Sequence, residues 1–141
     1  MTAKGLCFTV PGAPRGKGRP RFSRGGFAYT DKKTAAYESL VALAFTAAYP
    51  DWVPTEEPVE MQFMAYFPIA KSWSKKKKAE AIAGAIRPTG KPDTDNIAKV
   101  KDALNGIAYK DDAQVITEHI EKWYSDVPRL EIKIILHAGI V

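Results

Sequence analysis

The most informative stretch of this chain is KPDTDNIAKVKDALNGIAYKDDAQ, residues 91–114. Pro92 disfavours helical geometry at the residue before it, so a helix in this stretch begins after the proline. Asp93 or Thr94 then stands at the N-cap, where a short polar side chain accepts a hydrogen bond from a free backbone N–H. The pattern predicts a helix from about Thr94 to Asn105.

Acidic side chains gather on one face of this predicted helix. Asp95, Lys99 and Asp102 are spaced i, i+4 and i+7 and therefore share a face. The opposing apolar stripe comprises Ile97, Val100 and Leu104. Asp111 and Asp112 follow after a short turn, which can bring one of them back beside the helix start. Five of the sixteen acidic residues of a basic chain thus fall in this one region.

Each acidic residue also has an ordinary structural explanation. Asp93 can be a helix cap, Asp95 and Lys99 an exposed ion pair, and the Asp111–Asp112 pair a turn. Together, however, the carboxylates repel one another, and a divalent cation would remove that repulsion. Mg²⁺ prefers such hard oxygen ligands together with waters and a substrate phosphate. A lysine on the same face would stabilise developing negative charge, so the pattern favours metal-dependent phosphodiester hydrolysis.

The rest of the chain predicts an α+β fold. Outside residues 91–114, alternation of apolar and polar residues indicates strands at 4–10, 59–67, 113–124 and 130–137. Apolar residues at helical spacing indicate helices at about 31–49 and 75–83, and a loop is expected at 11–29. We expect a single domain over residues 1–141, with a mixed β-sheet packed by helices in the order β-α-β-α-α-β-β. We expect the last two strands to be neighbours in the sheet.

Composition narrows the class of protein. The net charge is +5, which weakly favours a polyanionic partner. The single cysteine, Cys7, excludes an internal disulfide and a four-cysteine zinc site, and its apolar surroundings predict a buried, inert thiol. No apolar run is long enough for a membrane helix, and the first ten residues do not resemble a secretory signal. We therefore expect a cytoplasmic protein with no membrane association.

Positive side chains crowd the loop before the first predicted helix. Glycine and proline separate the basic residues there, which are Arg15, Lys17, Arg19, Arg21 and Arg24. Such a segment can follow the phosphates of DNA, or it can be a solvated loop. Phe22 and Phe27 can stack on unpaired bases, or they can pack onto the protein body. Lys91 precedes the acidic stretch and is well placed for a phosphate contact.

Two motifs give the chain a family resemblance. The acidic stretch, from Asp93-Thr-Asp95-Asn-Ile-Ala-Lys99 to Asp111-Asp112-Ala-Gln, resembles the core signature of RusA-type Holliday junction resolvases. The basic loop from Val10 to Phe22 is similar to the phage and prophage branch of that family. It is richer in glycine and arginine than the loop of the better-known branch, so cleavage-sequence preference is not predicted.

The resemblance implies a Mg²⁺-dependent homodimer, with Mn²⁺ as a substitute, that cuts four-way DNA junctions by paired symmetric incisions and uses no small organic cofactor. It assigns metal binding to Asp93, Asp95 and Asp112, and the transition state or leaving group to Lys99. Asp111 is then a supporting ligand, and Asp102 a supporting residue that orients Lys99 or lies on the helix surface. The DNA-binding residues are expected to be Arg15, Lys17, Arg19, Arg21, Phe22, Arg24 and Lys91.

Two other functions remain compatible with these residues. One is a branched-DNA-binding module without catalysis, in which the acidic cluster is structural. The other is a nuclease of the same chemistry that acts on flaps or replication forks. Asp95→Asn separates the first from a nuclease, and the relative cleavage rates on different branched substrates separate the second.

Overall fold

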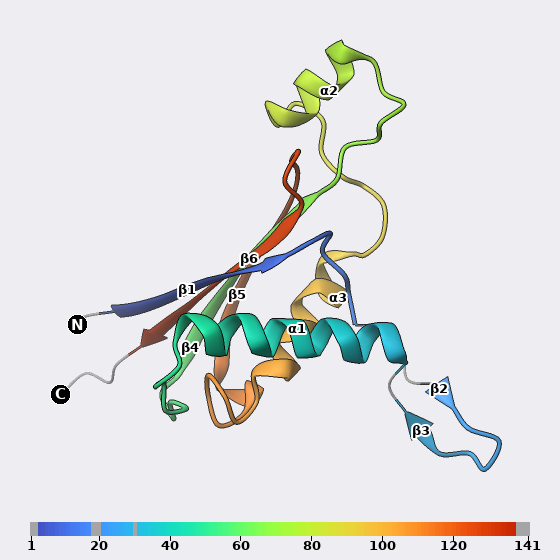
Figure 1. Ribbon diagram of the computed structural model, residues 1–141. Coiled ribbons are helices and arrows are strands. Elements are labelled where there is room, and N and C mark those ends of the chain that lie inside the picture. The colour runs from blue at the N-terminus through green and yellow to red at the C-terminus, as the bar shows by residue number, and fades with distance from the viewer. Residues whose placement is uncertain (1–2, 18–20, 30, 138–141) are drawn as a thin grey trace.

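Strand β4 (Val59–Phe67) runs through the middle of a four-stranded sheet in the computed structural model, which describes residues 3–17, 21–29 and 31–137 (Figure 1). The strand order is β1 (Ala3–Pro11), β6 (Arg129–His137), β4 and β5 (Val115–Tyr124). β6 is antiparallel to both β1 and β4, whereas β4 and β5 are parallel. The predicted α+β class with a mixed sheet is confirmed.

The last two strands are not neighbours, so that prediction was wrong. β4 lies between β5 and β6, and the turn at 125–128 crosses the end of β4. The backbone N–H of Ser125 donates to the carbonyl of Phe67 at 3.0 Å, which fixes this crossing. β4 alternates between buried and half-buried residues along its whole length. A strand with one fully buried face gains most from a central position, which local sequence patterns do not reveal.

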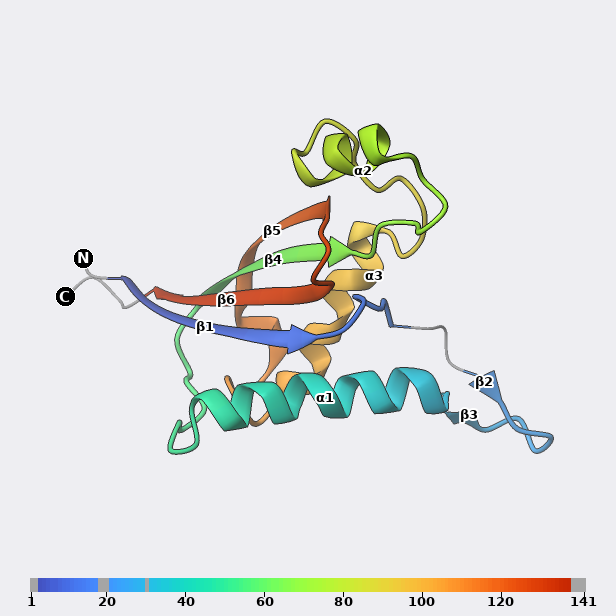
Figure 2. The same cartoon turned by 45° about the horizontal axis from the view of Figure 1, so that its top comes forward.

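Helices cover one face of the sheet. α1 (Lys32–Ala48) begins at the N-cap Asp31 and buries Tyr37, Val41 and Phe45. These side chains share a core with Met61 and Phe63 of β4 and with the buried residues of the segment after Pro92, which are Ile97, Val100 and Leu104. The predicted apolar stripe is therefore confirmed. Figure 2 shows α1 and the segment that contains α3 on the same side of the sheet.

The other face of the sheet is open. In β1, Leu6, Phe8 and Val10 point into the core. Cys7 lies between them in the sequence, so it points to the open face, where it is exposed. The prediction of a buried thiol was wrong because the period-2 alternation of an edge strand decides burial, and an apolar neighbourhood in the sequence does not.

The helix predicted at 94–105 is divided. It consists of α3 (Thr94–Ala98) and the 3₁₀-helix η1 (Lys99–Leu104). The Tyr109 hydroxyl donates to the carbonyl of Lys101 at 2.6 Å, while the N–H of Asn105 turns to the carbonyl of Asp102 at 3.3 Å. An intruding hydroxyl thus occupies the acceptor that an α-helix would offer to Asn105, and the turn tightens.

Two smaller elements project from this body. The loop predicted at 11–29 contains a hairpin, formed by β2 (Arg21–Phe22) and β3 (Ala28–Tyr29), which extends beyond the start of α1 (Figure 1). The second element, α2 (Lys75–Ile82), is capped by Ser74 and lies beyond the end of β4 (Figure 2). The described part of the chain contains no helix long and apolar enough to cross a membrane.

Candidate active site along helices α3 and η1

The first part of the site is the start of α3. Asp93 is the N-cap, and its carboxylate accepts from the backbone N–H of Asn96 at 3.0 Å. Asp95 lies in the first turn, and its carboxylate is 3.5 Å from the Lys99 ammonium. That ammonium also donates to the Asn96 side chain at 3.3 Å. The Asp95 side chain is 82% exposed, so its oxygens are available to a ligand or an ion.

The second part of the site is a pair of carboxyl groups, Asp102 of η1 and Asp112 of the 3₁₀-helix η2 (Asp112–Gln114). The hydrogen bond with Asp102 is the largest cause of a raised pKa at Asp112, with burial and the charge of Asp102 adding to it. Burial acts to raise the pKa of Asp102, but hydrogen bonds with Lys17 and Asp112 outweigh it and lower that pKa. Ionisation of Asp112 is therefore disfavoured by its neighbour, whereas ionisation of Asp102 is favoured.

Lys17 joins the basic loop to this carboxyl pair. Its ammonium donates to Asp102 at 3.0 Å and lies 3.5 Å from Glu38 of α1. The hydrogen bond to Asp102 is the main reason that the pKa of Lys17 is raised. The sequence predicted a phosphate contact for Lys17, and it predicted that Asp102 orients Lys99 or lies on the helix surface. In the structure these two residues contact each other, and the phosphate contact of Lys17 stays a prediction.

The backbone of the basic loop is pressed against α3. The N–H of Lys17 donates to the carbonyl of Asn96 at 3.1 Å. A Cβ at Gly16 would lie 2.8 Å from the Cβ of Asn96 and 2.9 Å from that of Pro92. Real Cβ atoms do not approach other carbons so closely, so glycine at position 16 permits the contact.

Asp111 has a structural role next to Asp112. Its carboxylate accepts from the N–H of Ala113 at 3.0 Å and caps η2. The Gln114 side chain accepts from the N–H of Asp111 and donates to the carbonyls of Thr55 and Glu57, each at 2.9 Å. These contacts fix the backbone that carries Asp112. Asn105 also donates to Asp112, at 3.4 Å.

The structure brings together some of the predicted site residues and not others. Asp95 contacts Lys99, and Asp112 contacts Asp102. Asp95 and Asp102 are seven residues apart, which is about 11 Å along a helix of this kind. Within residues 3–17, 21–29 and 31–137, no three Asp, Glu, His or Cys side chains are grouped so as to hold a metal ion. The metal-binding roles of Asp93, Asp95 and Asp112 remain predictions.

The predicted DNA-binding residues lie along one side of this site. Arg21, Phe22 and Arg24 are exposed on the hairpin, and Phe22 and Phe27 are 70% and 76% exposed. Packing of these rings onto the body, the alternative left open above, is therefore wrong. Arg19 lies outside the described residues. Lys91 lines a hollow next to the basic loop and α3.

Several residues of this region were not singled out from the sequence. Asn96 and Asn105 contact Lys99 and Asp112, and the buried Tyr109 holds η1 in place. Asn96 directly follows Asp95 and was a visible signal. The other two contacts depend on the turn at 105–111, which local periodicity does not predict.

Comparison with known proteins adds to this geometry. The model of the family described as endodeoxyribonuclease RusA matches residues 11–135. The chain belongs to this RusA family. The match includes the basic loop, α3, the Asp102–Asp112 pair and the whole central strand, so the RusA resemblance inferred from two motifs is confirmed over nearly the full chain.

A second comparison finds a relative in Bacillus subtilis strain 168. This RusA-family chain is 45% identical over 133 residues to the uncharacterized protein YqaN, and the alignment covers 90% of this chain and 93% of YqaN. The two proteins are thus similar over their full domains. RusA proteins are endodeoxyribonucleases that act on branched DNA, so DNA is the class of partner that the family match supports for this chain.

Proposed function

We propose that this RusA-family protein is a Mg²⁺-dependent endodeoxyribonuclease that resolves Holliday junctions by paired symmetric phosphodiester hydrolysis. The observation that carries the proposal is the docking of a basic loop directly onto an acidic helix. Gly16 and Lys17 contact α3 and η1, which carry Asp93, Asp95, Lys99 and Asp102. A phosphate held by the loop would therefore lie next to carboxylates and a lysine.

The candidate donors are carboxylate oxygens, the type of ligand that a hard divalent cation prefers. The neighbouring Asp102 carboxyl group raises the pKa of Asp112, and a cation between the two groups would remove the repulsion that this shift reflects. We assign metal binding to Asp112, Asp93 and Asp95, with Asp102 and Asp111 in support. When bound, Mg²⁺ supplies Lewis-acid activation of water and offsets charge on the phosphate. Mn²⁺ offers the same chemistry.

The chain's own residues then have separate tasks. Asp95 and Asn96 hold the Lys99 ammonium at 3.5 and 3.3 Å, in position to stabilise negative charge on the phosphate or the leaving oxygen. Asp93 fixes the start of α3 through its cap. Lys17 holds Asp102 against the loop, so that DNA binding and the carboxyl pair are connected through one side chain.

A homodimer would match the substrate. A four-way junction presents two symmetry-related strands, and a two-fold pair of sites cuts both within one binding event. We further propose that the enzyme acts in the cytoplasm in DNA recombination and repair, in the service of a phage or prophage.

Cleavage of synthetic substrates tests the proposal. Four-way, three-way and flap DNAs are incubated with the protein in Mg²⁺ or Mn²⁺, and the positions of the two nicks are mapped. We expect symmetric nicks and the fastest rate on the four-way junction. Equal rates on all three substrates would contradict the assignment as a Holliday junction resolvase and would favour a nuclease that acts on flaps or forks. Asp95→Asn is expected to bind junctions without cutting them, and a variant that cuts normally would remove Asp95 from the site.

A further inference from the structure

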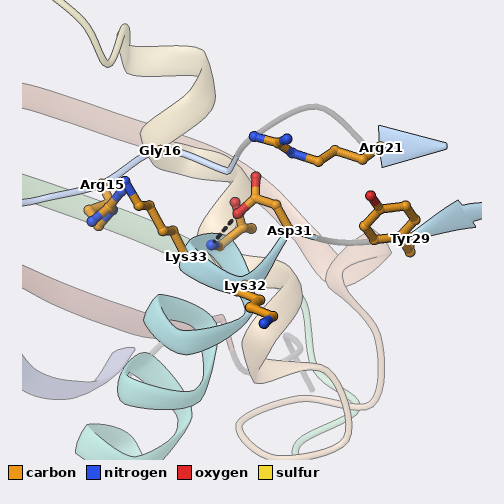
Figure 3. Close-up of a pocket in the computed structure, with 8 residues that line it drawn as sticks. Arg15, Gly16, Arg21, Tyr29, Asp31, Lys32 and Lys33 are labelled. Atoms are coloured by element: carbon orange, nitrogen blue, oxygen red, sulfur yellow. Dashed lines mark hydrogen bonds between the residues drawn. The ribbon is translucent and has the colours of Figure 1, made fainter. Parts of the chain in front are cut away.

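A positively charged cleft lies between the hairpin and the start of α1. Its volume is about 490 Å³, within the range of ligand sites. The residues that line it are Arg15, Gly16, Arg21, Tyr29, Asp31, Lys32, Lys33 and Thr34. In Figure 3, Arg15 and Lys33 lie on one side of Asp31. Arg21 and Tyr29 lie on the other side, and Lys32 points away from Arg15.

The charge of the cleft is not neutralised by the protein. Among the residues that the structure describes, Arg15, Lys32 and Lys33 form no ion pair with an acidic side chain. The one carboxylate in the lining, Asp31, accepts from the backbone N–H of Thr34 at 2.7 Å and caps α1. The lining therefore contains four cationic side chains and one capping carboxylate, and an anionic ligand would be bound by side chains rather than by the helix terminus.

The cleft leads to the candidate active site. Arg15 and Gly16 also line a second hollow of about 480 Å³, together with Lys91, Pro92 and Asn96. Because Arg15 and Gly16 lie between the two hollows, a chain of phosphates could pass from the start of α3, over the loop, into the cleft. The cleft would then hold nucleotides next to the phosphate that is cut.

An aromatic ring at the entrance indicates the kind of strand. Tyr29 is half exposed, and its hydroxyl has no hydrogen-bond partner among the described residues. A free ring beside unpaired cations is typical of sites for single-stranded nucleic acid, where bases stack on aromatics and phosphates contact Lys and Arg. A paired duplex offers phosphates but no exposed base face.

We propose that this cleft binds an unpaired DNA strand at the branch point, with phosphates at Arg15 and Lys33 and a base stacked on Tyr29. The inference deepens the proposed function, on which it rests for the identity of the substrate. It adds Tyr29 and Lys33 to the residues that bind DNA, and it assigns the enzyme a preference for junctions whose centre is open.

Binding by the full chain in EDTA tests the lysine. Fluorescence anisotropy compares a four-way junction, a single-stranded oligonucleotide and a fully paired duplex. Lys33→Gln is expected to weaken junction and single-strand binding by about tenfold and to lower the salt dependence of log K by about 0.7, the loss of one phosphate contact to an unpaired strand. Lys133→Gln, which removes the same charge from the open face of the sheet, is the matched control and is expected to bind like wild type. Equal affinities for the two variants would overturn the proposal.

Binding by Tyr29 variants tests the stacked base. Tyr29→Leu is expected to lose about tenfold in affinity for the junction and the single strand but not for the duplex, whereas Tyr29→Phe retains the ring and rescues binding. A junction with 2-aminopurine at its centre is expected to change its fluorescence on binding wild type and Tyr29→Phe, and not on binding Tyr29→Leu. Equal losses on duplex DNA would contradict an unpaired strand.

The inference and the proposed function fail in different ways. If the wild type cuts no branched DNA in Mg²⁺ or Mn²⁺ while Lys33→Gln still loses single-strand binding, the nuclease proposal fails and the cleft stands. If the wild type cuts four-way junctions while both cleft variants bind like wild type, the cleft proposal fails alone.

Discussion

Gly16→Ala is expected to separate the basic loop from α3. A Cβ at this position would lie 2.8 Å from the Asn96 Cβ, 2.9 Å from the Pro92 Cβ and 3.3 Å from the Asn96 carbonyl carbon. Carbon atoms in contact prefer about 3.5–4.0 Å, so the overlap is roughly 0.7 Å or more. These atoms belong to the backbone or lie next to it, so no flexible side chain can move aside. Overpacking of this kind costs about 1–3 kcal/mol.

Two measurements follow the effect of Gly16→Ala. The Tm is expected to fall by roughly 3–10 °C in a chain of this size. Junction cleavage is expected to fall by about 100-fold, because a shift of about 1 Å in the loop moves Lys17 away from Asp102. Gly90→Ala is the matched control, since a Cβ at Gly90 meets no atom within 4 Å. The docked-loop geometry would be refuted if both variants had the stability of wild type.

Three further variants probe the same network. Lys17→Met is expected to lower the free energy of unfolding by about 1 kcal/mol at neutral pH. Because the pKa of Lys17 is raised in the folded protein, this difference in stability should disappear as the pH rises above 10.5 and passes the pKa that Lys17 has in the folded state. Asp112→Asn is expected to raise the Tm above wild type at pH 7 without divalent cations. Because the pKa of Asp112 is raised, its ionisation at pH 7 opposes folding, and the gap should close as the pH falls below that pKa. Tyr109→Phe leaves the carbonyl of Lys101 without its donor and is expected to cost about 1–3 kcal/mol in urea unfolding.

Conservative variants serve as controls for this group. Lys17→Arg keeps a positive charge that can reach Asp102 and is expected to restore most of the stability. Tyr124→Phe removes a hydroxyl that has no hydrogen-bond partner in the described part of the chain, so it should unfold like wild type. An Asp112→Asn protein less stable than wild type at pH 7 would contradict the repulsion assigned to the carboxyl pair.

Local sequence rules predicted the parts of this molecule that depend on neighbouring residues. The cap at the start of α3 and the alternation of β4 follow from residues within one turn or one strand. The positions of apolar Ile97 and charged Asp95 on opposite faces of α3 follow in the same way. The cap depends on one polar side chain and the backbone three residues later, and the other two features depend on periods of 2 and 3.6 residues, all of which the sequence displays directly.

Contacts between distant residues could not be predicted in this way. Lys17 and Asp102 are 85 residues apart, and nothing in the local pattern pairs them. The insertion of β4 between β5 and β6 depends on which faces the helices cover. The tightening of η1 depends on one hydroxyl, that of Tyr109, which returns from beyond the turn.

The most direct test of a metal-dependent site on α3–η1 is four-way junction cleavage by wild type and Asp93→Asn, with and without Mg²⁺, alongside junction binding by both proteins. We expect cleavage only by wild type in Mg²⁺, with binding by Asp93→Asn within about twofold of wild type, because the asparagine still caps the helix. Cleavage by wild type in EDTA, or undiminished cleavage by Asp93→Asn, would contradict the account.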